Sequence, residues 1–148
     1  MTRRSFRTAF AGFAAILALL FLPAAAATAA QQNLLVVITS AEPEVQGMAM
    51  VLSRQSLEAG AEVRVLLCGP GGDIALVDAP QQALKPRNVT PQEMMIGLAA
   101  QGVTVEVCAL YLPNRDKAPG DLVNGVGVAK PPAIAAAMLA PNTRLFTF

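Results

Sequence analysis

Short apolar runs alternate with longer amphipathic stretches from residue 33 to the end of the chain. Three of these runs, residues 33–39, 62–68 and 103–108, are rich in β-branched side chains, and shorter ones follow at 126–129 and 144–148. Near-continuous apolar runs of this length are typical of strands that are buried on both faces of a parallel sheet. The pattern therefore predicts about five strands.

Helices are predicted between these strands. Residues 43–59 start with a proline and end before Gly60, and Thr90-Pro91-Gln92-Glu93 has the pattern of a capping box that begins a second helix, ending at Gly102. A third helix is predicted from Pro131. The buried face expected for the first helix consists of Val45, Met48, Ala49, Leu52 and Ala59. Strands that alternate with helices predict an α/β fold with a mainly parallel sheet covered on both faces.

The first 30 residues have the three parts of a secretory signal peptide. Arg3, Arg4 and Arg7 form a positive start, residues 9–22 are almost all apolar, and Ala27-Thr28-Ala29 fits the small-residue rule for cleavage. The apolar run is shorter than the roughly 20 residues needed to span a bilayer, and a retained membrane anchor is the alternative. We expect residues 1–30 to be removed, and residues 31–148 to form a single domain in the periplasm or outside the cell, without membrane attachment.

The segment Thr2-Arg3-Arg4-Ser5-Phe6 also resembles the start of a twin-arginine signal, which directs the export of folded proteins. The apolar run after it is more hydrophobic than we expect for that route, so the ordinary secretory route is the alternative. Both routes predict an exported protein.

Charge and composition narrow the function further. The whole chain has 11 basic and 10 acidic side chains, and removal of the three arginines in the predicted signal leaves an excess of acidic residues. No basic stripe remains for nucleic acid. The chain has no histidine, which excludes Ser-His-Asp and Cys-His catalysis and histidine metal sites. The two cysteines suffice for one disulfide or for thiol chemistry, and we expect no metal and no cofactor.

Cys108 is the strongest candidate for a functional side chain. It is predicted at the C-terminal end of a strand, where open α/β sheets place ligands and reactive groups. A helix start after it, together with Arg115 and Lys117 nearby in the sequence, would favour its thiolate without histidine. The alternative is a small buried side chain that only closes the core.

Cys68 is predicted at the corresponding end of the second strand. In an oxidising compartment, a disulfide with Cys108 is one interpretation. A bridge between neighbouring parallel strands requires that both the Cα separation and the Cβ directions fit. We therefore favour plain core packing of Cys68.

Two other motifs are better explained by packing than by ligand binding. Residues 69–73 form a glycine-rich loop after a strand, but it lacks Lys-Ser/Thr and G-x-G-x-x-G, so we expect a tight turn and no phosphate site. The spacing of Met48, Met50, Met94 and Met95 is that of helix faces, and no histidine accompanies them, so we expect core packing rather than copper binding.

The chain from the third predicted strand onward resembles the DsrE/DsrF-like family of sulfur-relay proteins. The resemblance rests on Gly102-Val103-x-Val105-x-Val107-Cys108-Ala109, a later Gly125-Val126-x-Val128, a helix start at Pro131-Pro132 and a terminal aromatic strand. With the first strand and helix included, it covers roughly residues 33 to 148. It implies a three-layer α/β/α sandwich, a homo-oligomer (trimer or hexamer), and a role for Cys108 in accepting and passing on sulfur as a persulfide.

The chain differs from the family pattern in two ways. Pro113 lies where the family continues from the cysteine into a small-residue helix, so we expect that helix to shift or shorten. Export separates the protein from the cytoplasmic donors of the well-understood relays, and the sequence does not identify the donor or acceptor protein. We therefore expect a periplasmic sulfur carrier or redox-active thiol at Cys108 rather than a turnover enzyme. The alternative is a non-enzymatic binding or assembly module with structural cysteines.

Overall fold

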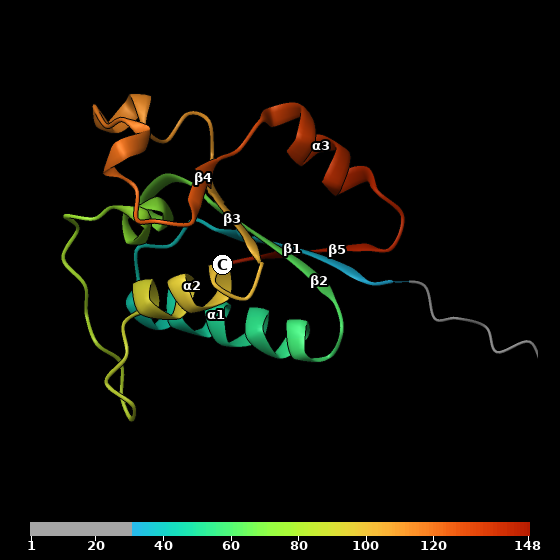
Figure 1. Cartoon of the computed structure of the whole chain (residues 1–148), viewed down its shortest axis with the longest axis horizontal. Coiled ribbons are helices and arrows are strands. Elements are labelled where there is room, and N and C mark those ends of the chain that lie inside the picture. The colour runs from blue at the N-terminus through green and yellow to red at the C-terminus, as the bar shows by residue number, and fades with distance from the viewer. Residues whose placement is uncertain (1–30) are drawn as a thin grey trace, which may run out of the picture.

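A single five-stranded parallel sheet forms the centre of the protein (Figure 1). The computed structural model describes residues 31–148, so the predicted signal peptide lies outside the described residues. The strands are β1 (Asn33–Ile38), β2 (Glu62–Leu67), β3 (Thr104–Val107), β4 (Val126–Val128) and β5 (Thr143–Thr147). Their order in the sheet is β4-β3-β2-β1-β5, which confirms the predicted α/β fold.

Helices cover both faces of this sheet, as expected for a three-layer sandwich. The helices α1 (Pro43–Glu58) and α2 (Pro91–Ala99) lie on one face, and α3 (Pro131–Leu139) lies on the other (Figure 1). Three short 3-10 helices, η1 (Gly69–Ala75), η2 (Pro113–Arg115) and η3 (Pro119–Asp121), lie in the connections after β2 and β3. Within residues 31–148, no helix is long and apolar enough to cross a membrane.

Side chains of the central strands alternate between two cores of unequal size. On the α1–α2 side, buried residues of β1, β2 and β3 pack with Met50, Met95 and Leu98 of the helices. The small core on the α3 side consists of Leu35, Leu66 and Ala129, with Val37, Cys68, Cys108 and Ile134 packed against it. Because burial of a large aliphatic side chain contributes about 1.5–3 kcal/mol, the α1–α2 side supplies most of the packing stability.

The buried face of α1 differs from the predicted one. Met48 and Leu52 are 53% and 44% exposed, whereas Gln46 and Ser53 are buried. The Gln46 amide donates a hydrogen bond to the carbonyl of Ser40 (2.8 Å), and the Ser53 hydroxyl donates one to the carbonyl four residues earlier (2.7 Å). The predicted face was therefore wrong in part, because backbone oxygens satisfy two polar side chains at inward positions. Of the other predicted residues, Ala49 is buried, Val45 is half-buried and Ala59 is exposed.

The predicted start of α2 is confirmed. The Thr90 hydroxyl accepts a hydrogen bond from the Glu93 amide (3.1 Å), and the Glu93 carboxylate accepts one from the Thr90 amide (2.7 Å). This Thr90 backbone donor is the main cause that lowers the pKa of Glu93 below its usual value. Two amides that the helix itself leaves unpaired are thereby satisfied.

The glycine-rich segment after β2 forms the seven-residue helix η1, so the prediction of a tight turn was wrong. Two of its glycines lie in close contacts. A Cβ atom on Gly71 would collide with the carbonyl of Ile38, and one on Gly72 would collide with the ring of Tyr111. The Gly71 amide also donates a hydrogen bond to the carbonyl of Thr39 (3.1 Å). These glycines therefore allow η1 to pack directly against the end of β1 and the Tyr111 ring.

Candidate functional site

The two cysteines lie next to each other at the carboxyl edge of the sheet. In the pairing of β2 with β3, Leu67 lies opposite Val107, so the next residues, Cys68 and Cys108, continue the same register. The Cys108 amide donates a hydrogen bond to the carbonyl of Leu67 (2.8 Å), and the Cys68 amide donates to Ile38 of β1 (2.9 Å). The backbone at both cysteines is thus held by the neighbouring strand.

Both cysteines are free thiols, and each is partly exposed. Burial, and then the interaction with the neighbouring Cys108 thiol, together raise the pKa of the Cys68 thiol to about 12. Cys68 is therefore a thiol that stays largely protonated at neutral pH.

The surface of the sheet that carries the thiols also carries an ion pair. Arg64 lies two positions before Leu66 on β2, and Glu106 lies two positions before Cys108 on β3. Side chains two positions apart on a strand point to the same face of the sheet. The Nη2 atom of Arg64 lies 2.6 Å from the Oε2 atom of Glu106. Their side chains are 27% and 16% exposed, respectively. Two guanidinium nitrogens of Arg64 donate hydrogen bonds to the Glu106 carboxylate. The carboxylate therefore neutralises the positive charge of Arg64 on this face of the sheet.

The chain turns immediately after Cys108. The Tyr111 amide donates a hydrogen bond to the carbonyl of Cys108 (2.9 Å), and the helix η2 that follows spans only Pro113–Arg115. The expectation that Pro113 shortens the helix is confirmed. A full helix start does not stabilise a thiolate here, contrary to one expectation, because three residues of 3-10 helix carry little aligned dipole.

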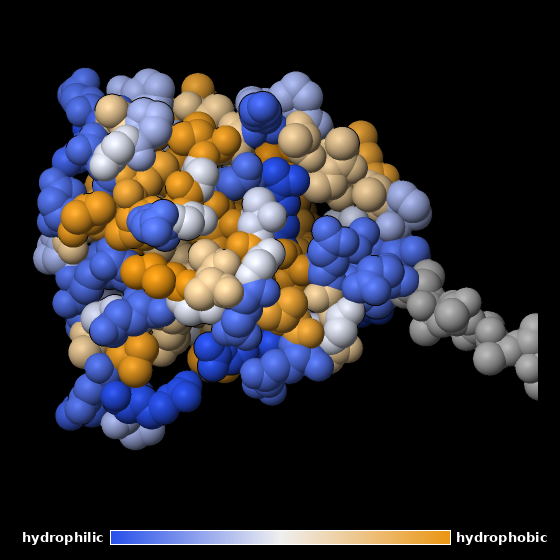
Figure 2. Space-filling view, in the orientation of Figure 1, coloured by the Kyte–Doolittle hydropathy of each residue, from blue (hydrophilic) through white to orange (hydrophobic). Residues whose placement is uncertain are grey.

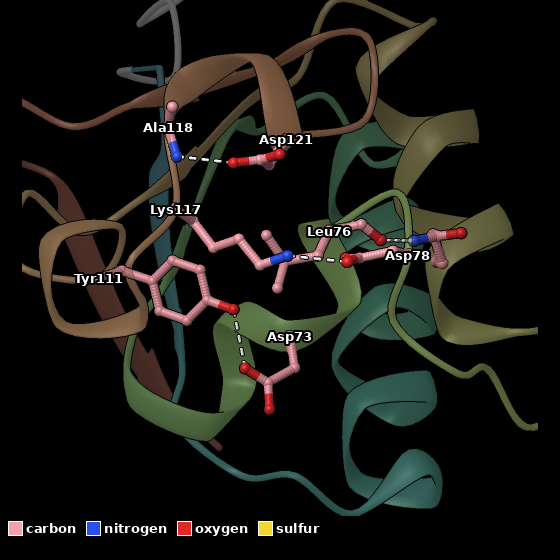
Figure 3. A network of polar contacts seen from close by, with 8 residues as sticks. Asp73, Leu76, Asp78, Tyr111, Lys117, Ala118 and Asp121 are labelled. Carbon is pink, nitrogen blue, oxygen red and sulfur yellow. Dashed lines mark hydrogen bonds and ion pairs between the residues drawn. The ribbon is translucent and has the colours of Figure 1, made fainter.

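The cations predicted to assist Cys108 have carboxylate partners instead. Arg115 pairs with Asp73 of η1 at 3.2 Å. The Lys117 ammonium lies 2.7 Å from Asp78 (Figure 3). The Lys117 hydrogen bond lowers the pKa of Asp78, and the same bond raises the pKa of Lys117. Neither cation contributes to the shift in the Cys68 pKa. The structure therefore brings the two cysteines together but directs Arg115 and Lys117 toward acidic partners.

Tyr111 and Asp73, which the sequence analysis did not single out, are central to this polar network (Figure 3). The Tyr111 hydroxyl donates a hydrogen bond to Asp73 at 2.7 Å, and the Arg115 guanidinium lies 5.6 Å from the centre of the Tyr111 ring. Burial, and then the bond to Asp73, raise the pKa of Tyr111 above its usual value. The one available signal was a sole tyrosine three residues after Cys108, which does not by itself indicate a partner in η1.

A recess of 370 Å³ opens beside this network, and Gln46, Asp73, Gln81, Arg115 and Lys117 contribute to its lining. Neither cysteine is among the residues that line it. Its two cations are already paired with carboxylates. In residues 31–148, no three His, Cys, Asp or Glu side chains form a potential metal site. The thiol pair is therefore the part of the molecule with the clearest chemistry.

The same fold occurs in solved structures of low sequence identity. YchN from E. coli matches with a TM-score of 0.63 and 21% identity, over 80% of this chain and 99% of YchN. MTH1491, a protein of unknown function from Methanobacterium thermoautotrophicum, matches with a TM-score of 0.61 and 14% identity, over 80% of this chain and all of that chain (100%). No family model matches the sequence, and no curated protein matches it significantly. The structural likeness supports a YchN/DsrE-like fold.

Proposed function

We propose that this protein handles sulfur through Cys108, as a persulfide carrier or a redox-active thiol protein. The observation that carries the proposal is the pair of free thiols that lie side by side at the carboxyl ends of β2 and β3. Thiolate is the reactive form of cysteine, and the raised pKa of Cys68 keeps most of that thiol protonated. Cys108 is thus the nucleophile of the pair, in a fold resembling that of sulfur-relay proteins.

The proposed reaction is attack of the Cys108 sulfur on a sulfane sulfur of a donor. A new S–S bond forms at Cys108, the S–S bond within the donor breaks, and the remainder of the donor leaves with the electron pair. The signal-like residues 1–30 support action in the periplasm or outside the cell. A small donor such as inorganic polysulfide suits that location, because the cytoplasmic relay proteins are absent there.

Sulfur uptake is expected to depend on Cys108. After anaerobic incubation with sodium polysulfide, the Cys68→Ser variant should gain about 32 Da, one sulfur atom, on Cys108. The matched Cys108→Ser variant, which keeps only Cys68, should gain sulfur at least tenfold more slowly, because burial keeps most of its remaining thiol protonated. Mass spectrometry of the intact chain and of its peptides measures the adduct, and circular dichroism confirms that both variants are folded. An unmodified Cys108 in folded Cys68→Ser, or an adduct only on Cys68, would rule out the proposal.

A second proposal concerns assembly, and it is favoured by an exposed apolar surface on α3 and β5. This α3–β5 surface consists of Met138, Leu139, Leu145 and Phe146, which are exposed by 48% to 86% of their area. No residue of α3 is buried, and α3 contains no charged residue. Figure 2 shows hydrophobic residues gathered where Figure 1 places α3. The four side chains are apolar, and Arg144 is the one charged residue exposed on β5 beside them. An apolar surface of this kind fits a second copy of itself.

The position of β5 gives a second reason to expect a second copy. Within the described residues, β5 pairs only with β1, so its outer edge can accept another strand. Leu145 lies opposite Leu35 in the register, on the α3 side, and Phe146 lies opposite Val36, on the α1 side. Both faces of the edge strand therefore offer apolar side chains. We propose that copies of this chain associate through the α3–β5 surface.

Self-association is expected to be lost when a charge is placed on this surface. Size-exclusion chromatography with light scattering should give a mass of at least two chains for the wild type and a monomer mass for Leu145→Lys. The control Ile96→Lys changes another exposed apolar residue, 40% exposed on α2, and should leave the mass unchanged. A monomeric wild type, or dissociation by both substitutions alike, would contradict assembly through β5.

A further inference from the structure

The two cysteines are close enough for direct exchange between their sulfurs. Neighbouring strands in a sheet lie roughly 4.8 Å apart, and disulfides span Cα separations of about 4.4–6.8 Å. Cys68 and Cys108 continue the register of β2 and β3, and both pack against the small core on the α3 side. The amide of Cys108 also donates a hydrogen bond to the carbonyl of Leu67, the residue before Cys68 (2.8 Å). No large displacement is therefore needed to bring one sulfur to the other.

The chain that follows Cys68 does not separate its thiol from that of Cys108. Both cysteines lie one residue beyond the ends of their strands, and Gly69 follows Cys68 with φ +52. The chain turns away there into η1, whereas Cys108 stays bonded to Leu67 through its amide (2.8 Å). The sequence has no third cysteine, so the neighbour of each thiol on this chain is the other one.

From this geometry, and resting on the proposed persulfide at Cys108, we propose that Cys68 is the resolving thiol that releases the bound sulfur as hydrogen sulfide. Cys68 reacts through the small fraction of its thiol that is ionised, and its position beside Cys108 favours attack within the chain over attack on a free donor. The Cys68 sulfur attacks the Cys108 sulfur of the persulfide, and the bond between the two cysteine sulfurs forms. The bond from Cys108 to the outer sulfur breaks, and the outer sulfur leaves with the electron pair and takes up the proton of Cys68. The outer sulfur is reduced to sulfide, and the two cysteine thiols are oxidised to a disulfide.

This step requires no outside oxidant, because the bound sulfur is itself the electron acceptor. The disulfide that remains is returned to two thiols by a dithiol, which is oxidised to its own disulfide in exchange. A cycle results in which sulfane sulfur enters at Cys108, sulfide leaves, and one dithiol is consumed. The protein is then a sulfane-sulfur reductase of the thiol type rather than a carrier alone.

The test follows sulfide and mass together after loading. The purified chain is reduced, freed of reductant, loaded anaerobically with sodium polysulfide and desalted, and the released sulfide is trapped with monobromobimane. The wild type should release about one equivalent of sulfide per loaded chain and end about 2 Da below its reduced mass, as one disulfide requires. Cys68→Ser should hold its adduct of about 32 Da and release at least tenfold less sulfide.

Two controls separate the possible failures. A rate that does not change on tenfold dilution identifies the step as intramolecular, and Cys68→Ala should behave like Cys68→Ser. If Cys68→Ser takes up sulfur but the wild type holds its adduct equally long, the resolving role is overturned and the proposed sulfur carrier stands. If neither protein takes up sulfur, the proposed function itself fails.

Discussion

Cys68 is expected to alkylate at least tenfold more slowly than Cys108 when each is the only cysteine in the chain. The Cys108→Ser variant retains Cys68, and the Cys68→Ser variant retains Cys108. Because thiolate is the nucleophile, a pKa raised from 9.0 to about 12 removes most of the reactive form of Cys68 at pH 8. Burial is the largest cause of the shift, and it persists when Cys108 is replaced.

The measurement is the second-order rate of reaction with iodoacetamide as a function of pH. For Cys108→Ser the rate should rise about tenfold for each pH unit below the raised pKa, since the thiolate fraction grows by that factor. In concentrated urea, where burial is lost, the two variants should react at similar rates. Equal rates in the folded state would show that the two thiols are chemically equivalent, and the assignment of Cys108 as the nucleophile would then be wrong.

Met95→Ala is expected to lower the free energy of unfolding by about 2–5 kcal/mol. The Met95 side chain lies on α2, is 0% exposed and packs in the larger core between the sheet and the helices α1 and α2. Truncation to alanine removes buried apolar surface and leaves a cavity that the surrounding side chains fill only in part. Urea unfolding followed by circular dichroism gives the change in free energy.

The matched control is Met48→Ala on α1. Met48 is 53% exposed, and substitutions at exposed positions usually change stability by less than about 0.5 kcal/mol. The comparison shows that the buried Met95 contributes to the stability of the core and that the exposed Met48 does not. A loss at Met48 as large as that at Met95 would mean that this face of α1 is covered in solution.

The strands and the sheet type could be predicted because their signal is local. Apolar runs at β1, β2 and β3 alternate with helix signals, and this pattern has few solutions other than a parallel sheet covered on both faces. The capping box at Thr90 and Glu93 is equally local, since it depends on residues three positions apart. Such features need no knowledge of distant partners.

The errors come from interactions between distant segments. The partner of Lys117 is Asp78, 39 positions earlier, and the partner of Tyr111 is Asp73, 38 positions earlier. Ordinary turn signals flank these residues, so the sequence does not reveal that η1 faces the segment after β3. The proximity of Cys68 to Cys108 was foreseen as an alternative, because the ends of neighbouring parallel strands meet at one edge of the sheet. That the two cysteines are free, and that burial raises the pKa of Cys68, required the structure.

Cys68 precedes η1 and α2 in the chain and Cys108 follows them, and this placement has a consequence for the free energy of unfolding of the protein. A bond between Cys68 and Cys108 would tie the chain into a ring that encloses both elements. For a ring of this size, the loss of freedom in the unfolded chain corresponds to about 4 kcal/mol. Release of sulfide would thus leave the molecule in its more heat-resistant disulfide form, and reduction by a dithiol would return it to the less stable form with two thiols. The form with two free thiols would then accept sulfur but unfold or be proteolysed more easily, and the disulfide form would resist unfolding but accept no sulfur.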